Sequence, residues 1–206
     1  KEGGIWKIRA LHLFVNFVAP YEKGWARLKS GEGLAPSAAS KDFPPDRPPT
    51  STYRPFPETQ VPPFQASHPV TGAARSIPAS LLSTEPRITA YAQRVARLED
   101  QDAVENLQAM FGYYFDKGLW NETANLFAQN GTFEYGLSGV YVGRERIRRA
   151  LLLFGPQGLS QGYLNNHMQL QPVVNVATDG RTATGRWQGM VMLAEPGASG
   201  AWGVGI

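Results

Sequence analysis

The chain has 206 residues, of which 42% are hydrophobic and 18% charged, enough for one globular core with at most an added arm. Its formal charge of +3 argues against a nucleic-acid-binding protein, and no stretch approaches the roughly 18 apolar residues of a membrane span. The absence of cysteine excludes disulfides, thiolate metal sites and a cysteine nucleophile. We therefore expect neither nucleic acid nor membrane among the partners.

The two ends of the chain are predicted to form neighbouring strands. A turn at Glu2-Gly3-Gly4 precedes a long apolar strand over residues 5–17, and residues 201–206 form a second strand. We expect these strands to pair antiparallel, so that residues 1–18 close the sheet of a domain formed by residues 86–206. Such a pairing indicates a circularly permuted order, a cut from a tandem repeat, or renumbering across a gap; the alternative is an unrelated N-terminal hairpin.

Residues 19–85 are predicted to be a proline-rich arm. Eleven of the 16 prolines lie between Pro36 and Pro78, and proline disfavours both helix and sheet interior. Aromatic residues at intervals, such as Phe43, Tyr53 and Phe56, indicate that the arm lies on its own or a neighbouring subunit. A disordered spacer is the alternative.

The remaining residues show an α+β pattern of helices followed by long strands. Apolar residues at helical spacing predict helices over 88–98 and 104–114, with Gly118 as a stop. Further elements are expected as helices over 121–129 and 144–154 and as strands over 132–135, 140–142, 165–177 and 182–194. The arginines of the helix over 144–154 are predicted to be a solvated face, or otherwise a grip on an anion or a partner.

Three short motifs resemble a known family. Gly143-Arg144 with Ile147, Asn165-Asn166-His167 with Pro172-Val173-Val174, and Trp6-Lys7-Ile8 are similar to segments of the SnoaL-like domain, of the nuclear transport factor two-like superfamily. The resemblance implies a curved, mostly antiparallel sheet with helices that enclose a conical pocket, usually in a dimer or trimer. The superfamily includes scytalone-type dehydratases, ketosteroid isomerases, a diarylpropane lyase and non-catalytic binding modules.

His167 is the first catalytic candidate, because histidine exchanges protons near neutral pH and the family places a histidine on this strand. Asp116 is the second. The segment Phe115-Asp116-Lys117-Gly118-Leu119-Trp120 resembles a stretch of the scytalone-type dehydratases in which the aspartate pairs with the strand histidine. A surface histidine and an exposed acid near a helix end are the plain alternatives.

Other side chains are candidates for contact with a substrate. Tyr113 and Tyr114 are possible catalytic hydroxyl donors to a substrate oxygen, as in an oxyanion hole, although core tyrosines are commoner. The remaining candidates are predicted to line or wall the pocket, with core or interface positions as the alternative: Tyr135, Trp120, Trp187, His12, Asn16 and Asn165.

No cofactor or metal is expected. The histidines at 12, 68 and 167 show no close metal-ligand spacing, and the enzymes of the superfamily named above share cofactor-free chemistry. The sequence thus predicts an acid–base lyase, dehydratase or isomerase for a hydroxylated hydrophobic, aromatic small molecule, in a homo-oligomer whose arm contacts a neighbour. The tail over residues 19–72 is similar to an extension of a bacterial subgroup and favours a lignin-derived, diarylpropane-like compound. The alternative is a ligand-binding or assembly module without chemistry.

Overall fold

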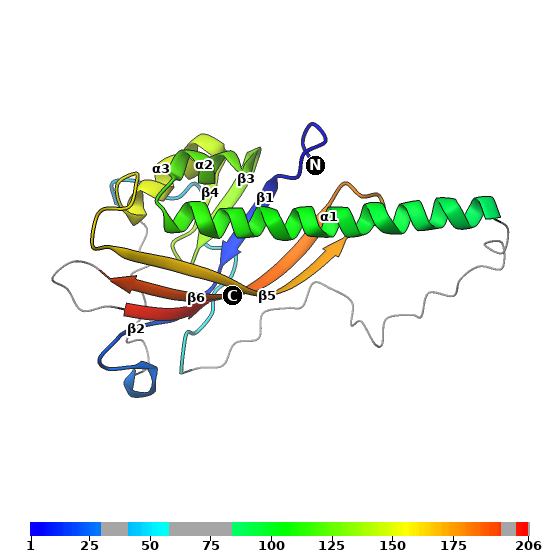
Figure 1. The fold of residues 1–206 in the computed structure, drawn as a ribbon. Coiled ribbons are helices and arrows are strands. Elements are labelled where there is room, and N and C mark those ends of the chain that lie inside the picture. The colour runs from blue at the N-terminus through cyan, green and yellow to red at the C-terminus, as the bar shows by residue number, and fades with distance from the viewer. Residues whose placement is uncertain (30–40, 58–83, 195–200, 206) are drawn as a thin grey trace.

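The computed structural model describes residues 1–29, 41–57, 84–194 and 201–205. Two sheets lie beside three helices (Figure 1). The smaller sheet has the order β1 (Ile8–Leu13), β3 (Phe127–Tyr135), β4 (Val140–Val142), and the larger has the order β2 (Val15–Pro20), β7 (Ala201–Gly205), β6 (Ala183–Ala194), β5 (Leu164–Val176). The helices are α1 (Thr84–Asp116), α2 (Trp120–Asn125) and α3 (Arg144–Leu151), with 3-10 turns at Trp25–Arg27 and Leu152–Phe154. The predicted α+β class is confirmed, with two sheets in place of a single curved one.

The N-terminal segment forms two strands instead of the single strand expected over residues 5–17. β2 pairs antiparallel with β7, as expected for its half, but β1 pairs parallel with β3. The physical reason lies at Val15, whose N–H donates to the Tyr53 hydroxyl at 2.9 Å while its carbonyl accepts from the same hydroxyl at 3.2 Å. The Tyr53 hydroxyl thus bonds the N–H and the carbonyl of Val15, two groups that could otherwise continue a single strand's hydrogen bonds to its neighbour. At this point the chain passes from the smaller sheet to the larger one.

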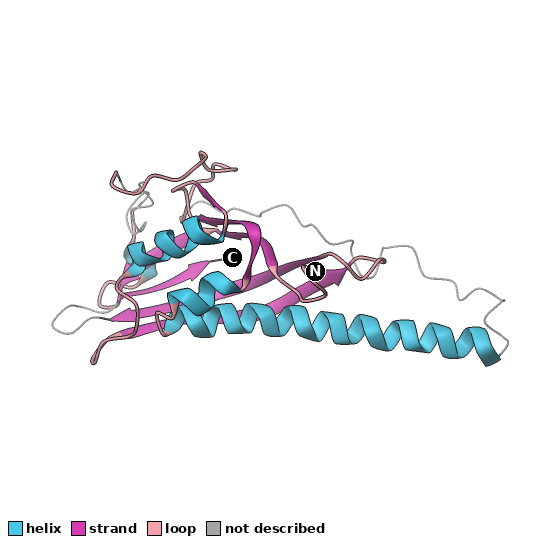
Figure 2. Ribbon diagram, turned by 90° about the horizontal axis from the view of Figure 1, so that it is seen from above, coloured by secondary structure: helices cyan, strands magenta, loops and turns pink. Residues whose placement is uncertain are grey.

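The two helices predicted over 88–98 and 104–114 are one continuous helix, α1. The acidic residues between them, Glu99, Asp100 and Asp102, do not interrupt the helix. Asp100 accepts a hydrogen bond from the Trp6 indole at 3.0 Å and pairs with Lys1. The helix ends where expected, since Gly118 adopts a positive φ of 62°. The C-terminal half of α1 runs alongside the long strands, and the N-terminal half projects past them (Figure 2).

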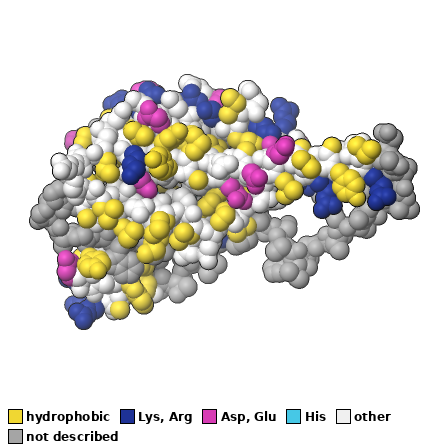
Figure 3. All heavy atoms as spheres, in the orientation of Figure 1, with side chains coloured by type: hydrophobic (Ala, Val, Ile, Leu, Met, Phe, Trp, Pro, Cys, Tyr) yellow, Lys and Arg dark blue, Asp and Glu magenta, His cyan; other side chains and the backbone are white. Residues whose placement is uncertain are grey.

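The projecting half of α1 carries an exposed apolar stripe. Ile88, Tyr91, Val95 and Leu98 are 54–61% exposed, although their spacing is that of a buried helix face. Figure 3 shows hydrophobic side chains along this part of the helix. The predicted amphipathic pattern is therefore present, but none of the described elements covers its apolar side.

The main core lies between the smaller sheet, α2, α3 and the end of α1. Phe115, Phe127, Phe133 and Ile147 are at most 2% exposed and belong to one cluster. α2 is shorter than the helix expected over 121–129, because residues 127–129 pair in β3 and let Phe127 enter this core. These contacts fix the C-terminal end of α1 against the smaller sheet.

The arginines of α3 hold residues 41–57 of the arm against the same chain. The Phe43 ring stacks on Tyr141, with the guanidinium groups of Arg146 and Arg149 4.2 Å and 4.6 Å from its centroid. Arg146 also pairs with Asp46 at 3.0 Å. This arginine face is thus a docking face for the chain's own arm. Contact of the arm with a neighbouring subunit stays a prediction.

The rest of the arm, residues 30–40 and 58–83 with His68, lies outside the described residues, and so does the turn expected at 195–197. In the described ranges, no helix combines the length and apolar character needed to cross a membrane. Nor does any group of three or more histidine and acidic side chains there have the arrangement of a metal site.

Candidate active site

A cavity of about 740 Å³ lies between the inner face of α1, the N-terminal strands and the β5–β6 pair. Its volume is within the range of roughly 300–1,000 Å³ of small-molecule sites. Along α1 its wall runs from Val104 to Phe115, a distance of about 16 Å at 1.5 Å per residue. Its wall is apolar along α1 apart from Gln108, whereas the polar side chains elsewhere in the wall include Lys1, Lys7, Arg9, Arg181 and Arg186 as well as His12, His167 and Gln169.

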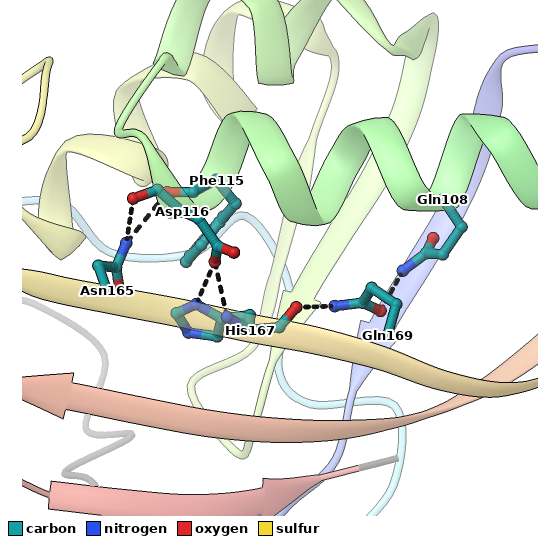
Figure 4. A network of polar contacts seen from close by, with 6 residues as sticks. All are labelled: Gln108, Phe115, Asp116, Asn165, His167 and Gln169. Atoms are coloured by element: carbon teal, nitrogen blue, oxygen red, sulfur yellow. Dashed lines mark hydrogen bonds and ion pairs between the residues drawn. The ribbon is translucent and has the colours of Figure 1, made fainter.

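Asp116 and His167 are in contact (Figure 4), and of the two His167 is a cavity-lining residue. Asp116 is the last residue of α1, and its Oδ1 lies 2.9 Å from His167 Nδ1. The same oxygen accepts the backbone N–H of His167 at 2.7 Å. Both side chains are largely buried, at 17% and 18% exposed. The sequence-predicted pair is therefore in hydrogen-bond contact.

The contact also determines which ring nitrogen can act on a ligand. An ionised carboxylate only accepts hydrogen bonds, so His167 Nδ1 carries the proton that bonds to Asp116. In the neutral imidazole this leaves Nε2 without a proton and able to accept one. The Phe115 ring packs edge-on against the imidazole, with centroids 4.8 Å apart, and limits its rotation.

Asn165 anchors the end of α1 to β5. Its Nδ2 donates to the carbonyl oxygens of Phe115 at 3.1 Å and Asp116 at 3.3 Å. The last carbonyls of a helix have no partner within the helix, so this side chain satisfies two of them. Asn165 was predicted to bind substrate, but it holds the carboxylate-bearing turn in place and is not among the cavity-lining residues.

A second polar link joins α1 and β5 two helical turns before Asp116. Gln108 Nε2 donates to Gln169 Oε1 at 2.9 Å, and Gln169 Nε2 donates to the His167 carbonyl at 3.1 Å. Gly112 lies between these contacts, where an added Cβ would be 2.9 Å from Gln169 Cγ. The absence of a side chain at this position lets the helix approach the strand closely enough for both links to form.

The predicted aromatic residues divide between the cavity and other places. Tyr135 and Trp187 line the cavity. Trp120 is buried in the core, with its indole N–H bonded to the Gly155 and Pro156 carbonyls. Tyr113 is 63% exposed, and Tyr114 packs against the main core. Burial raises the pKa of the Tyr135 hydroxyl, which keeps it protonated.

His12 belongs to a separate polar cluster. A bulge between Ile8 and Ala10 changes the alternation of β1, so that Leu11 and Leu13 pack on the core while His12 pairs with Glu134 on the other face. His12 Nδ1 is 3.4 Å from both Thr50 Oγ1 and Glu134 Oε2. His12 is among the lining residues, but these contacts direct Nδ1 at the arm and at Glu134.

Burial lowers the pKa of His12, although the Glu134 carboxylate and the Gly136 backbone act in the opposite direction. Asn16, the other candidate on this segment, is not a lining residue; its carbonyl accepts a hydrogen bond from the Phe56 N–H at 3.0 Å. The structure thus brings Asp116 and His167 together and leaves His12 and Asn16 associated with the arm.

The family model of the SnoaL-like domain matches residues 96–206, more than half of the chain. The chain belongs to the SnoaL-like family. The match covers the second half of α1 and every element that carries Asp116, His167 and the two glutamines. None of the curated proteins matches the chain significantly.

Sequence reasoning missed Gln108, Gly112 and Gln169 as site residues. Gln169 could have been found, since it alternates with Asn165 and His167 on one strand face. Gln108 and Gly112 precede Asp116 by eight and four residues, the spacing of one helix face. The sequence therefore shows that these residues share a face with Asp116 or His167. It does not show that α1 packs on β5, which is what brings the two faces together.

Proposed function

We propose that this SnoaL-like chain is a cofactor-independent acid–base enzyme, a lyase, dehydratase or isomerase acting on a hydroxylated, hydrophobic small molecule. One observation carries the proposal: a largely buried histidine, oriented by a carboxylate, lies in the wall of a cavity of ligand size. Family membership is consistent with this chemistry, but the fold alone does not assign it.

In the proposed mechanism, His167 Nε2 takes a proton from a carbon next to a hydroxyl-bearing carbon. Asp116 holds Nδ1–H and stabilises the imidazolium that forms. In a dehydration, the imidazolium then returns the proton to the hydroxyl, which leaves as water as the C=C bond forms. In an isomerisation, the same proton returns to another carbon of the conjugated system. The Tyr135 hydroxyl, which stays protonated, is the proposed donor to a substrate oxygen in the cavity.

The apolar wall with Phe111, Phe115 and Trp187 favours an aromatic substrate. Together with the similarity of the tail to that of a bacterial subgroup, it supports a lignin-derived, diarylpropane-like compound as the finer proposal.

The test is turnover of a panel of hydroxyaryl alcohols and diarylpropane-like diols, followed by loss of water or formaldehyde in mass spectra. For any compound converted, we expect His167→Ala to lower kcat by at least about 100-fold and Asp116→Asn by about 10- to 100-fold. Asn166→Ala is the matched control, since Asn166 pairs with Met192 on the opposite face of the strand. Full activity of His167→Ala would refute the proposal, and ligand binding without turnover would favour the binding-module alternative.

We also propose that the chain forms a homo-oligomer in which the stripe on the projecting half of α1 meets the same stripe of a second copy. The four exposed side chains are spaced by three, four and three residues. An antiparallel pairing therefore places Ile88 opposite Leu98 and Tyr91 opposite Val95 of the partner helix, which makes the stripe self-complementary.

A further inference from the structure

Two amide side chains, Gln108 and Gln169, lie in the part of the cavity wall formed by α1 and β5, where Gln108 is the one polar lining residue of α1. Gln108 is only 6% exposed, and its neighbours in the wall are Val104, Leu107 and Phe111. Burying an amide among such side chains costs free energy unless its polar groups are hydrogen-bonded. Each donor and acceptor of the two amides is therefore expected to have a partner, either in the protein or on a bound molecule.

The hydrogen bonds fix the orientation of both amides. The group of Gln169 that faces the His167 carbonyl must be the nitrogen, because a carbonyl oxygen cannot donate. Its oxygen then faces Gln108 and must receive the Gln108 Nε2 donor. Gln108 Oε1 is consequently the end of the side chain that is not used in the pair.

This oxygen is not sealed off from its surroundings. Among the described residues, three side-chain nitrogen and oxygen atoms are fully buried without a hydrogen-bond partner: His12 Nε2, Ser51 Oγ and Arg148 Nε. Gln108 Oε1 is not among them, so it is not fully buried. The described residues also give Gln108 Oε1 no hydrogen-bond donor. An acceptor that is neither sealed nor bonded, on a side chain in the cavity wall, is able to receive a hydroxyl group of a bound molecule.

The distance between Gln108 and the Asp116–His167 pair indicates which hydroxyl of a ligand would bind here. His167 and Gln169 are two residues apart on β5, which corresponds to about 7 Å along the strand. Gln108 and Asp116 are eight residues apart on α1, which corresponds to about 12 Å along the helix. These backbone separations are comparable to the length of an aromatic ring with two para substituents, so a ligand that reaches both places would carry the accepted hydroxyl across a ring from the reacting carbon.

We propose that the Gln108–Gln169 pair is a specificity site that binds a phenolic hydroxyl, so that the substrates are phenols whose reacting side chain lies across the ring. The inference rests on the proposed function, because it takes the cavity as the place where substrate binds. A site that bonds a hydroxyl binds an analogue without it more weakly, since the hydrogen bond to the amide oxygen is then lost.

The test compares two binding probes on the full chain: 4-hydroxybenzyl alcohol, and 4-methylbenzyl alcohol, whose methyl group replaces the phenolic hydroxyl. Affinities are measured by ligand-observed NMR titration at pH 7, where the phenol is neutral. We expect the native chain to bind the hydroxyl probe about 3- to 10-fold more tightly, the ratio that corresponds to one net hydrogen bond.

Gln108→Met should remove this preference and leave the affinity for the methyl probe within about 2-fold, because methionine has a similar shape without polar groups. Gln108→Leu removes the same acceptor and serves if Gln108→Met does not fold, as judged by circular dichroism. His167→Ala is the contrasting variant and should keep the preference. Equal binding of the probes to the native chain, or a preference that persists in both folded glutamine variants, would overturn the inference.

These measurements need no turnover, so they separate the two proposals. A preference that depends on Gln108 supports the specificity site even if no compound of the panel is converted. Conversion of a compound with no phenolic hydroxyl as fast as its phenolic counterpart would overturn the specificity site and leave the acid–base function standing.

Discussion

Replacing Gly112 by alanine should impair the site far more than it impairs the fold. The new Cβ would be 2.9 Å from Gln169 Cγ, 3.3 Å from the His167 carbonyl oxygen and 3.4 Å from Gln169 Nε2. Carbon atoms in contact prefer about 3.5–4.0 Å, so Gln169 Cγ must move by about 0.6–1.1 Å, while the His167 carbonyl must give by a few tenths of an ångström. The His167 carbonyl is backbone, so part of this shift is passed directly to the residue that carries the imidazole.

Two opposing terms set the stability change. Alanine in a helix interior is favoured over glycine by about 1 kcal/mol, whereas overpacking costs about 1–3 kcal/mol. The net loss in unfolding free energy should therefore be about 0–2 kcal/mol. A misplacement of 1 Å at a catalytic group costs about 100-fold in rate, so a shift of a few tenths of an ångström at His167 should lower turnover by up to about 10-fold.

The assay combines chemical denaturation, kcat on a converted compound, and the NMR signal of the His167 Nδ1–H proton, which reports its bond to Asp116 without any substrate. Ala109→Gly is the matched control. It lies on the exposed side of the same helix, so it should lose about 1 kcal/mol of stability and keep its activity. If Gly112→Ala retained full turnover and an unchanged Nδ1–H signal, the close approach of α1 and β5 would not be what positions Asp116 and His167.

Three further outcomes test other parts of the structure. Phe43→Ala should lower the unfolding free energy by about 3 kcal/mol in urea, because the ring is 9% exposed and stacks on Tyr141. Leu98→Glu should shift the sedimenting species toward the monomer, because a charge enters the stripe on the projecting half of α1. Lowering the pH through the ordinary histidine pKa near 6.5 should destabilise the fold, because burial lowers the pKa of His12 and the unfolded chain takes up the proton first. The stability of His12→Phe, measured from pH 7 to pH 5, should lack this component.

Each of these outcomes has a result that contradicts it. An unchanged midpoint for Phe43→Ala would mean that the arm adds little to the fold, with Tyr21→Ala as the control because Tyr21 is 73% exposed. A monomeric native chain, or association unaffected by Leu98→Glu, would reject the self-complementary stripe. Equal pH profiles for the native chain and His12→Phe would show that His12 titrates alike when folded and unfolded.

The order of helices and strands after residue 86 could be predicted from the sequence, because hydrophobic periodicity and turn residues are local signals. The junction of the two sheets could not. Alternation counted from Trp6 places Ile8 and His12 on one face, but the register shift between Ile8 and Ala10 separates them, and no local residue pattern announces it. Ile8 packs on the main core, whereas His12 lines the cavity, as predicted, and contacts Glu134.

Within the site, the pairing of Asp116 with His167 was predicted from a family resemblance and not from their separation in the chain. The side chains that fix the pair were not found, because each is ordinary in its own element. Asn165 is one polar residue among several on its strand, and Gln108 is an amide beside an apolar helix face. Their roles come from the contact between helix and strand, which is a tertiary property.

The passage of one segment through both sheets has a mechanical consequence. β1 belongs to one sheet and β2 to the other, and Phe14 stands between them with its ring 3.8 Å from His12 and 5.4 Å from Tyr53. Moving the two sheets apart would therefore strain the Phe14 ring contacts and the two hydrogen bonds between Tyr53 and Val15. Residues 41–57 of the arm are therefore tied, through Tyr53, to the two lining residues at which the chain leaves one sheet for the other.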